Sequence, residues 1–485
     1  MSVITDLVDA AAARLPDRPA VIESGGATVS FAELRHRIEA VATWVAERSR
    51  PGAAVAVVAD NSADYAVAYY AVPRAGRVLA LINQRLGPAE RAAQLRGLAP
   101  ALVLGDPGYL AGVPDAVAFD SPAWAAALTG PPAPPPAPAP DDPAWLLFTS
   151  GSTGRPKPVR HTHRSILAAV RGAVAGRAVA SDAVYLLPFP MCHIAGYNML
   201  VHHAVAATVV LTAHFRPAEF VELVRRHGVT SCSLAPTMLQ ALLDHLDTTG
   251  TRLPTLRAIA YGSAAMPAGL IRRAIELLDV DFHQGYGMTE TAGNVTFLGP
   301  DDHRSGDPRL LASAGYPHHD VRLRIVGADG APLPPGGVGE IEVSGPQVCA
   351  PGWLRTGDVG RLDPDGRLYV LDRVKDVIIT GGENVASREV EDVLSAHPAV
   401  AEVAVVGVPD PYWGEAVCAV VVPTPGVPRP EADELAGFVR ARIAAFKRPR
   451  HVLFVDALPR TTNGKVAKDE LRSRARAELG LDGIG

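Results

Sequence analysis

The sequence has little of several features that define common protein classes. It contains four cysteines in 485 residues, and their wide spacing excludes a zinc knuckle or a dithiol motif, so we expect reduced and mostly buried thiols. The formal net charge of −5 gives no sign of nucleic-acid binding. No apolar run reaches the length of a membrane span, and residues 1–16 lack the basic region and cleavage site of a signal peptide. We therefore expect a cytoplasmic protein without a membrane span.

What the chain does contain is enough apolar sequence for a large core. Apolar residues make up 48% and charged residues 20% of the sequence, which implies a globular protein with more than one domain. In the first two thirds, short apolar or β-branched runs alternate with helical stretches, which predicts an α/β fold. These predicted strands are 55–59, 101–104, 145–148, 208–211, 229–234 and 256–261. The proline- and alanine-rich tract 131–140 predicts a stiff, solvated connector within this domain.

The sequence pattern changes twice toward the carboxyl end. Residues 321–326 and 339–344 read as antiparallel strands separated by turn-rich sequence. After Lys375 the pattern predicts a compact α+β unit. Its predicted strands are 377–380, 400–406, 417–422 and 452–455, and its predicted helices are 387–396 and 431–445. The sequence contains no internal repeat that we can find.

One loop carries the strongest chemical signal. A strand-like run, 145–148, leads into Thr149-Ser150-Gly151-Ser152-Thr153-Gly154-Arg155-Pro156-Lys157. Glycines let backbone approach an anion, hydroxyls donate to phosphate oxygens, and an ammonium balances their charge, so the loop suits ATP. It differs from the common P-loop, because prolines flank Lys157. Taken alone, the stretch also fits a flexible Gly/Ser surface loop.

Four further stretches follow in the order found in one family. They are Tyr286-Gly287-Met288-Thr289-Glu290, then Thr356-Gly357-Asp358, then Arg373-Val374-Lys375-Asp376 with Gly381-Gly382-Glu383-Asn384, and Asn463-Gly464-Lys465. With the loop at 149–157, they make the chain resemble the adenylate-forming superfamily of acyl-CoA synthetases, peptide-synthetase adenylation domains and luciferases. The resemblance covers nearly the whole chain and is closest to the acyl-CoA synthetases.

The resemblance implies both a fold and a reaction. The fold would be α/β, with a large N-terminal domain of α/β subdomains plus a small β-barrel-like subdomain over 1–374, and a small mobile α+β domain over 375–485. A carboxylate would attack the α-phosphorus of ATP, and pyrophosphate would leave an acyl-AMP anhydride. The acyl group would then pass to a thiol, that of CoA or of a carrier protein's phosphopantetheine arm.

Other classes fit the sequence less well. A luciferase-like oxidation of the adenylate leaves no mark in the sequence. A non-catalytic nucleotide-binding relic would be free to lose Lys157, Glu290, Asp358 and Lys465, all of which are present. A dehydrogenase is disfavoured because no G-x-G-x-x-G follows a predicted strand.

The resemblance also assigns the nucleotide site. The ATP and AMP contacts would be Thr149, Ser150, Gly151, Ser152, Thr153, Gly154, Lys157, Gly262, Ser263, Tyr286, Thr289, Asp358 and Arg373. Thr289 would reach the α-phosphate, and Glu290 would bind Mg²⁺ together with phosphate oxygens and waters. Lys465 would bridge the carboxylate and the α-phosphate. Without the family context, Thr289 and Glu290 would be read as a helix start and Lys465 as a surface lysine in a turn.

The same resemblance places the acyl and thiol sites. The acyl pocket would be formed by His193, Ala195, Gly196, Asn198, Gly287, Met288 and Asn294, with His193 beside the reacting carboxylate. Because 189–200 contains no aspartate to meet an ammonium, a non-amino acid, fatty or aryl, is favoured. Lys375 stands at the family's hinge position. Gly381, Gly382 and Glu383 would border the tunnel for a thin pantetheine arm.

Three departures from the family pattern stand out. Pro158 replaces the glycine that follows the Pro-Lys pair, and Asp372 replaces the glycine before Arg373. The link from Val348 to Trp353 is much shorter than usual. Since the missing segment normally runs near the nucleotide pocket, we expect altered geometry there or a site open to a larger acceptor.

Overall fold

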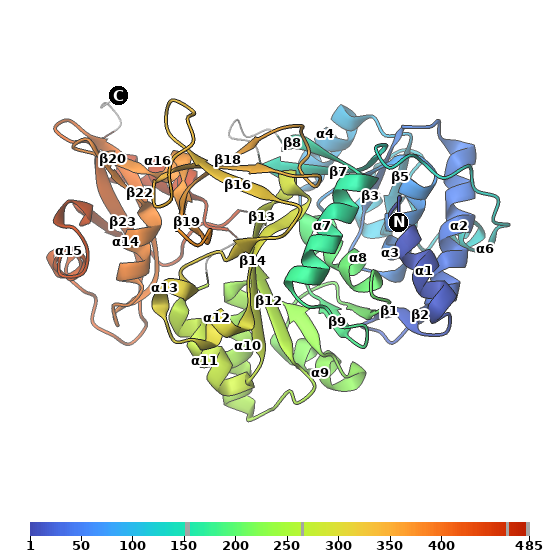
Figure 1. Cartoon of the computed structure of the whole chain (residues 1–485), viewed down its shortest axis with the longest axis horizontal. Helices are drawn as coiled ribbons and strands as arrows, with labels where there is room; N and C mark the ends of the chain where they lie inside the picture. Colours follow the sequence, from blue (N-terminus) through green and yellow to red (C-terminus); the bar gives the residue numbers. More distant parts are fainter. Residues whose placement is uncertain (151–155, 263–265, 462–464, 482–485) are drawn as a thin grey trace. The chain divides into compact units, whose positions relative to one another are not determined.

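The computed structural model describes residues 1–150, 156–262, 266–461 and 465–481 (Figure 1). The chain divides into two compact units, Met1–Leu323 with Val343–Leu354, and Arg324–Glu342 with Arg355–Gly485. This division by contacts does not follow the predicted domain boundary at 374/375, which stays a prediction about the hinge. Among the described residues, no helix combines the length and the apolar character that crossing a bilayer requires.

The larger sheet of the first unit has nine strands in the order β15-β14-β13-β12-β11-β9-β10-β1-β2. These strands are β1 Pro19–Glu23, β2 Thr28–Ser30, β9 Val184–Leu187, β10 Thr208–Leu211, β11 Ser231–Ser233, β12 Ala258–Gly262, β13 Asp281–Met288, β14 Gly293–Leu298 and β15 Tyr316–Pro317. The strands from β1 to β13 in this order run parallel, whereas β14 returns antiparallel to β13. The turn between β13 and β14 therefore lies at the carboxyl end of the parallel strands.

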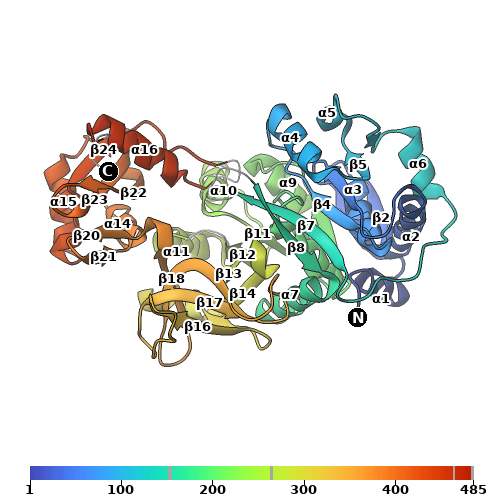
Figure 2. The ribbon, with the colours of Figure 1, turned by 90° about the horizontal axis from the view of Figure 1, so that it is seen from above.

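The second sheet of this unit has the order β6-β5-β3-β4-β7-β8. Its strands are β3 Ala54–Val58, β4 Val78–Leu81, β5 Leu102–Gly105, β6 Val117–Ala118, β7 Pro143–Ser150 and β8 Pro156–Thr162. Figure 2 shows β7 and β8 as the two long neighbouring arrows of this sheet. The predicted strands of the first two thirds all overlap observed ones, so the α/β prediction is confirmed.

Helices cover both sheets of the first unit. They are α1 Asp6–Arg14, α2 Phe31–Arg48, α3 Ala63–Arg74, α4 Pro88–Leu98, α5 Pro107–Leu110, α6 Pro122–Thr129, α7 His163–Gly176, α8 Tyr197–His203, α9 Pro217–His227, α10 Pro236–Thr249, α11 Ala268–Leu278, α12 Pro300–Arg304 and α13 Pro308–Leu311, with 3₁₀ turns η1 Ile194–Gly196 and η2 Thr289–Thr291. One face of the nine-stranded sheet is apolar, with Leu186, Ile259 and Phe282 buried against Leu239 and Leu243 of α10. This packing fixes the sheet that carries the β13–β14 turn.

The predicted connector at 131–140 contains no helix or strand over 131–139. It is held to the first unit by hydrogen bonds, because Arg74 donates to the Pro135 carbonyl at 2.8 Å and the Ala133 N–H donates to Thr43 at 2.9 Å. The tract is therefore a tethered connector within the domain, as its composition predicts.

A third sheet of four strands follows, in the order β16-β17-β18-β19. Its strands are β16 Arg322–Val326, β17 Gly339–Ser344, β18 Leu354–Leu362 and β19 Leu368–Arg373. The two strands predicted at 321–326 and 339–344 are confirmed. The β subdomain that the resemblance implied is thus a four-stranded sheet.

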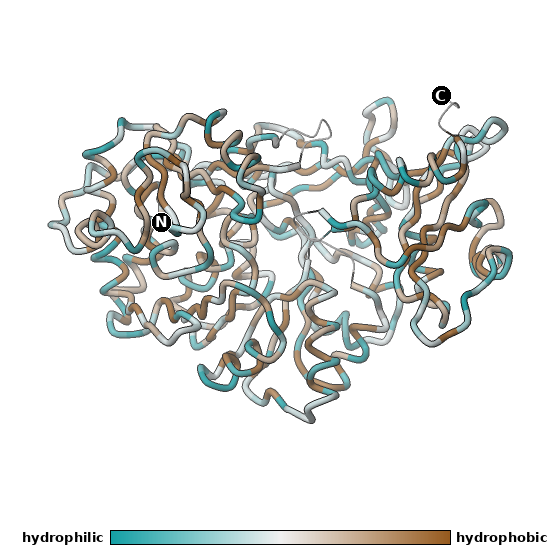
Figure 3. The backbone as a smooth tube through the Cα atoms, turned by 180° about the vertical axis from the view of Figure 1, so that it is seen from behind, coloured by the Kyte–Doolittle hydropathy of each residue, from teal (hydrophilic) through white to brown (hydrophobic). Residues whose placement is uncertain are grey.

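The carboxyl-terminal part has a five-stranded sheet in which β24 pairs with β23 beside the path β21-β20-β23-β22. Its elements are η3 Val374–Asp376, β20 Ile378–Thr380, β21 Glu383–Val385, α14 Ser387–Leu394, β22 Val400–Asp410, β23 Gly414–Pro423, α15 Ala432–Arg440, η4 Ala445–Lys447, β24 His451–Phe454 and α16 Lys468–Glu478. In Figure 3 the strands of this sheet are mostly brown, the hydrophobic colour. The helix predicted to reach residue 396 ends at Leu394, since Pro398 follows and the residue before a proline is disfavoured in helix.

The cysteine prediction agrees with the structure. Cys192, Cys232 and Cys418 are buried, Cys349 is exposed, and all four are free thiols.

Candidate active site

The predicted phosphate loop is the tip of the β7–β8 hairpin. Thr149 pairs with Lys157 across the hairpin, and Ser150 pairs with Pro156. The Thr149 hydroxyl lies 3.4 Å from the Lys157 carbonyl oxygen. Gly151, Ser152, Thr153 and Gly154 lie outside the described residues. Two antiparallel strands therefore hold both ends of the loop in register, and the exposed Lys157 stands at its exit.

Thr289 and Glu290 lie on the tight 3₁₀ turn that joins β13 to β14. The turn closes through Thr291, whose hydroxyl accepts the Met288 N–H at 3.0 Å and donates to the Gly293 carbonyl at 2.7 Å. A side chain at Gly287 would collide with the backbone of Gly293, so the Tyr-Gly-Met motif needs its glycine for this close approach. The turn leaves the side chains of Thr289 and Glu290 partly exposed.

A buried histidine joins the phosphate hairpin to this turn. His161 of β8 donates from Nε2 to the Thr289 carbonyl at 2.7 Å, and its Nδ1 lies 3.3 Å from the Ser165 hydroxyl. Burial lowers the pKa of His161 to about 4, although the bond to Thr289 opposes the shift. The ring is therefore neutral near pH 7, and its single N–H points at Thr289. The sequence offers no motif from which this contact follows.

The short link at 345–352 reaches the same turn. Gln347 is fully buried and donates to the carbonyls of Thr291 and Asn294 at 2.7 and 3.0 Å. Two residues later, the Cys349 N–H donates to the Glu290 carbonyl at 2.9 Å. The link thus packs directly on the backbone of the predicted metal ligand.

The Cys349 thiol is influenced by charges of both the hairpin and the turn. Partial burial raises the pKa of this thiol, the Glu290 carboxylate raises it further, and the Lys157 ammonium lowers it. The Glu290 carboxylate and the Lys157 ammonium therefore both influence the Cys349 thiol in the first unit. A carboxylate and an ammonium placed in this way suit a metal ion and a polyphosphate, respectively.

Glu290 fits magnesium better than a metal that needs a full protein cage. Within the described residues, the side chains that form a possible metal-binding group of three are His318, His319 and Asp320, and Glu290 is not among them. Mg²⁺ is commonly held by one or two carboxylates and completes its shell with phosphate oxygens and water. The single carboxylate on the exposed turn matches that donor set.

The remaining predicted nucleotide positions of the first unit lie on β12 and β13. Gly262 ends β12 and pairs with Gly285, whose carbonyl leaves no room for a side chain at Gly262. Tyr286 lies one residue further along β13 and pairs with Thr296 of β14. Ser263 lies outside the described residues. These residues bring glycine-rich backbone to the edge that also carries the Thr289 turn.

The predicted acyl-pocket residues come from the segment before α8 and from the β13–β14 turn. His193 caps the short turn η1, and its carbonyl accepts the Gly196 N–H at 2.9 Å. Gly196 is packed so tightly against Tyr69 and Met191 that a side chain there would collide with both. Asn198 is buried and donates to the Ala195 carbonyl at 2.8 Å. Ala195, Gly196 and Asn198 are thus brought together, with Gly287, Met288 and Asn294 on the neighbouring strands.

Arg177, which the sequence does not single out, connects these two segments. Its guanidinium donates to Asn198 at 2.6 Å, to the Tyr197 hydroxyl at 2.9 Å and to Asn294 at 2.6 Å. The Tyr197 hydroxyl also donates to Asn294 at 2.6 Å. Arg177 directly follows α7, far in sequence from Asn294, so only the tertiary structure reveals the contact.

The second unit gathers three other predicted residues. Asp358 is buried on β18, and its carboxylate pairs with the Arg373 Nε of β19 at 2.8 Å. Lys465 lies close to both: surrounding protein lowers the pKa of its ammonium, repulsion from Arg373 lowers it further, and Asp358 raises it. Gly357 has φ +72°, a conformation that explains the glycine of the Thr-Gly-Asp motif.

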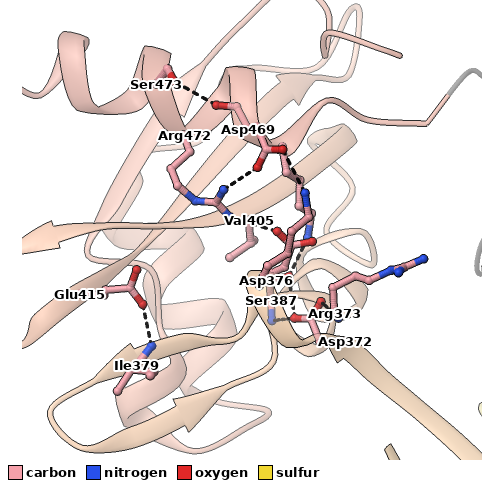
Figure 4. Close-up of polar contacts among 12 residues, drawn as sticks. Asp372, Arg373, Asp376, Ile379, Ser387, Val405, Glu415, Asp469, Arg472 and Ser473 are labelled. Atoms are coloured by element: carbon pink, nitrogen blue, oxygen red, sulfur yellow. Dashed lines mark hydrogen bonds and ion pairs between the residues drawn. The ribbon is translucent and has the colours of Figure 1, made fainter. Parts of the chain in front are cut away.

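Figure 4 shows a polar network around the predicted hinge. The buried Asp372 carboxylate accepts the N–H and the hydroxyl of Ser387, the first residue of α14, with the hydroxyl at 2.7 Å. Lys375 pairs with Asp469 of α16 at 2.9 Å, and Asp376 pairs with Arg472 at 3.0 Å. A glycine at position 372 would supply no side-chain acceptor to α14. Asp372 therefore gives the start of α14 a fixed contact.

The predicted thiol-tunnel residues form an exposed turn between β20 and β21. Gly381 and Gly382 have φ of +60° and +82°, and both precede Glu383. The Gly381 N–H donates to the Trp413 carbonyl at 2.8 Å, and a side chain at Gly381 would collide with the Trp413 ring. The turn thus offers thin, open backbone, as passage of a pantetheine arm requires.

Comparisons with known proteins extend over nearly the whole chain. The family described as AMP-binding enzyme matches residues 8–352, and the AMP-binding enzyme C-terminal domain matches residues 389–465. Feruloyl-CoA synthase from Amycolatopsis sp is 36% identical over 95% of this chain and 97% of its own length. Fatty acid–[acyl-carrier-protein] ligase ScoC from Streptomyces coeruleorubidus is 33% identical over 95% of this chain and 94% of its own length.

A solved structure is similar over the same extent. The o-succinylbenzoate CoA synthetase MenE from Bacillus subtilis, in complex with its acyl-adenylate intermediate, has a TM-score of 0.84 with 31% identity. The match covers 96% of this chain and 97% of that chain.

Proposed function

The chain belongs to the AMP-binding enzymes, in the group that includes acyl- and aryl-CoA ligases, and from that premise we propose that it activates a non-amino carboxylic acid as acyl-AMP and transfers the acyl group to CoA. The observation that carries the proposal is the meeting of the phosphate hairpin, the Glu290 turn and the short link in the first unit. His161 binds the Thr289 carbonyl at 2.7 Å, and Cys349 binds the Glu290 carbonyl at 2.9 Å. These contacts join the turn to the hairpin and to the link, which supports the proposed roles of Lys157 toward ATP and of Glu290 toward Mg²⁺.

In the first half-reaction the carboxylate oxygen bonds to the α-phosphorus of ATP, and the bond from that phosphorus to the pyrophosphate oxygen breaks. The main obstacle is repulsion between two anions, so positioned cations supply most of the catalysis. Lys157 and Lys465 would provide that charge, and Thr289 would donate to the α-phosphate. Asp358 would accept hydrogen bonds from the ribose hydroxyls, with Arg373 beside it. Mg²⁺, held by Glu290, would neutralise phosphate charge.

In the second half-reaction a thiolate attacks the acyl carbon and AMP leaves. Here we propose that Lys375 acts as a hinge, which would replace Lys465 at the reacting centre by the turn at Gly381 and Gly382. The exposed backbone of that turn supports this role, since a narrow arm needs close approach to main chain. His193 would border the acyl carboxylate in both steps.

The acceptor has a second candidate, a carrier protein. The similarity to the carrier-protein ligase ScoC favours it, because the two chains match along nearly their full lengths. Both acceptors present the same phosphopantetheine thiol, so the exposed turn at 381–383 accommodates either. The acyl group, fatty or aryl, is left open by the relatives, whose substrates differ.

Acid-dependent exchange of labelled pyrophosphate into ATP tests the first half-reaction. We expect exchange with at least one pool among fatty acids, benzoates, cinnamates and dicarboxylates, and none with amino acids. Thioester formation with CoA and with a phosphopantetheinylated carrier protein then separates the two acceptors. Folded protein that binds ATP but shows no exchange with any pool would refute the proposed adenylation.

A further inference from the structure

The face of the nine-stranded sheet opposite its apolar core is polar near Arg177. The register places Tyr185, Ser231, Ala258 and Asp281 in one row across the strands, and Ser233, Ala260 and His283 in the next. In a parallel sheet, residues paired in this way point to the same side. Serine and alanine are small, and Gly285 and Gly287 continue the same face of β13 toward the predicted acyl pocket, where Asn294 packs closely against Gly285. This face therefore leads from the polar rows of the sheet to Asn294.

Two polar atoms on this face lack partners. Within the described part of the chain, neither His283 Nδ1 nor the Ser231 hydroxyl has a hydrogen-bond partner, although both atoms are buried. His283 is only 9% exposed. Buried polar atoms are normally satisfied, because leaving one without a partner is costly. A polar group from outside the chain, water or ligand, would complete these two atoms.

Arg177 is the cation of the region, and among the described residues it has no ionic partner. Its three hydrogen bonds, of 2.6–2.9 Å, all go to neutral oxygens, those of Tyr197, Asn198 and Asn294. Across the residues that the structure describes, no carboxylate lies within ion-pair distance of its guanidinium. Three of its five N–H groups are used, which leaves the Nε–H and one Nη1–H available. A partly buried cation of this kind gains most from an anion that arrives with the ligand.

The position of Arg177 at the end of α7 does not by itself explain this arrangement. A cation at a helix carboxyl terminus is stabilised by the helix dipole, but only weakly at an exposed site. A side chain turned to solvent would gain the same stabilisation from the dipole. Instead the guanidinium is turned inward: burial first, and the charge of Arg177 in addition, lower the pKa of His202 to about 3 and that of His283 to about 4.

We propose that Arg177 is a specificity-determining residue of the acyl pocket and binds a second carboxylate of the substrate acid. The inference rests on the proposed function, because it takes Asn198 and Asn294 as walls of that pocket. A guanidinium binds a carboxylate through two parallel N–H···O bonds, and Tyr197, Asn198 and Asn294 hold the plane of Arg177 fixed for this contact. The substrate class would be a dicarboxylic acid, one carboxylate of which is activated while the other is bound. An ammonium group would be repelled, in keeping with a non-amino acid.

The test compares matched acids in the pyrophosphate exchange assay. Each pair shares a carbon skeleton, and one member carries a distal carboxylate where the other has a methyl or hydrogen. The series runs from glutarate to azelate, with phenylene diacids beside them. For the wild-type enzyme we expect kcat/KM for the best diacid to exceed that of its monoacid by about 10²-fold or more, the usual effect of removing one partner from a desolvated charge pair.

Three variants make the test specific. Arg177→Gln should remove the preference by lowering kcat/KM for the diacid about 10²-fold more than for the monoacid, and Arg177→Lys should restore part of it. Asn294→Asp, which places a carboxylate beside Arg177, should also abolish the preference and serves if Arg177→Gln does not fold. Arg171→Gln, on the exposed side of the same helix, is the matched control and should keep the preference.

The outcomes separate the two proposals. Exchange with monoacids alone, or an Arg177→Gln variant that loses activity equally on both members of a pair, would overturn the role of Arg177 and leave the adenylation intact. No exchange with any acid would overturn the proposed function and, with it, this inference.

Discussion

At the scale of single residues, the proposed chemistry depends on cations whose charge is modulated by their surroundings. Lys465 illustrates this, because crowding by protein and repulsion from Arg373 both lower the pKa of its ammonium. A lowered pKa means that the charge is lost at a lower pH than in an ordinary lysine. The rate of the first half-reaction should therefore decline earlier on the alkaline side than an unperturbed lysine would allow.

Substitution of Lys465 tests its role directly. Lys465→Ala should slow adenylation by roughly 10²–10³-fold, by analogy with loss of one transition-state donor, and leave thioester formation from supplied acyl-AMP largely intact. Lys465→Arg should retain some activity and move the alkaline limb of the pH profile upward. The measurements are pyrophosphate exchange and thioester formation in parallel, with Lys468→Ala avoided as a control because Lys468 bonds Ser387 and Glu391. Equal loss of both half-reactions would contradict a role confined to the first.

Glu290 gives a second prediction at this scale. Glu290→Gln keeps the size of the side chain and removes its charge, so we expect the Mg²⁺ concentration for half-maximal exchange to rise by roughly 10-fold or more. Titration of activity with Mg²⁺ at fixed ATP measures it. Glu276→Gln, an exposed residue of α11, is the matched control. An unchanged magnesium profile in Glu290→Gln would exclude the residue as the ligand.

Residues in contiguous motifs were within reach of the sequence, whereas residues that act through tertiary contacts were not. The Thr-Gly-Asp and Tyr-Gly-Met-Thr-Glu stretches can be recognised in the sequence by their glycines. The structure explains Gly357 by its backbone conformation and Gly287 by its close packing. His161 and Arg177 lack any such local mark. Their partners, Thr289 and Asn294, lie more than a hundred residues away in the chain.

At the scale of elements, strand prediction worked where apolar runs were bounded by turns. The strand at 208–211 was predicted with its observed bounds, because its four residues are apolar or β-branched and buried. No strand was predicted at 281–288, because Asp281, His283, Gln284 and two glycines interrupt any apolar pattern. That strand is defined by its neighbours β12 and β14 and by the polar face it presents. Functional strands escape prediction for this reason.

The contact between the β19 end and α14 yields a prediction about stability. Asp372→Gly removes the acceptor of the Ser387 N–H and hydroxyl, both buried, so we expect the second unit to lose about 1–3 kcal/mol of unfolding free energy. Asp372→Asn should cost less, because it keeps an acceptor oxygen. Urea unfolding followed by hydrogen exchange in 355–481 measures the change, with the exposed Asp365→Asn as control. An Asp372→Gly variant as stable as wild type would show that the carboxylate does not hold α14.

At the scale of the whole molecule, comparison of sequences establishes the family of the chain. The five motifs identified the superfamily correctly, and the full-length matches confirm it.

Five histidines are buried in the first unit, and burial lowers the pKa of each. The pKa falls to about 3 for His202 and to about 4 for His161, His163, His203 and His283. Each binds a proton more readily in the unfolded chain, where its pKa is about 6.5.

These histidines predict acid sensitivity. Because their folded pKa values lie below the unfolded value, their contribution is fully present above about pH 6.5 and is lost as the pH falls toward 4. In that window each histidine should reduce unfolding free energy by about 1.4 kcal/mol per pH unit. Unfolding measured at several pH values checks the slope. His203→Gln should make it shallower by one proton, and the exposed His214→Gln should leave it unchanged; equal slopes in wild type and His203→Gln would contradict the assignment.

Helix α7 fixes the orientation of Arg177. The helix begins directly after β8, at the base of the β7–β8 hairpin, and its 14 residues end at Gly176, next to Arg177. The helix cannot shift along its axis, since side chains at Gly172 and Gly176 would collide with His318 and Phe297. Inserting one residue would turn Arg177 by about 100°. The hydrogen bonds from Arg177 to Asn198 and Asn294 therefore depend on the exact length of one helix.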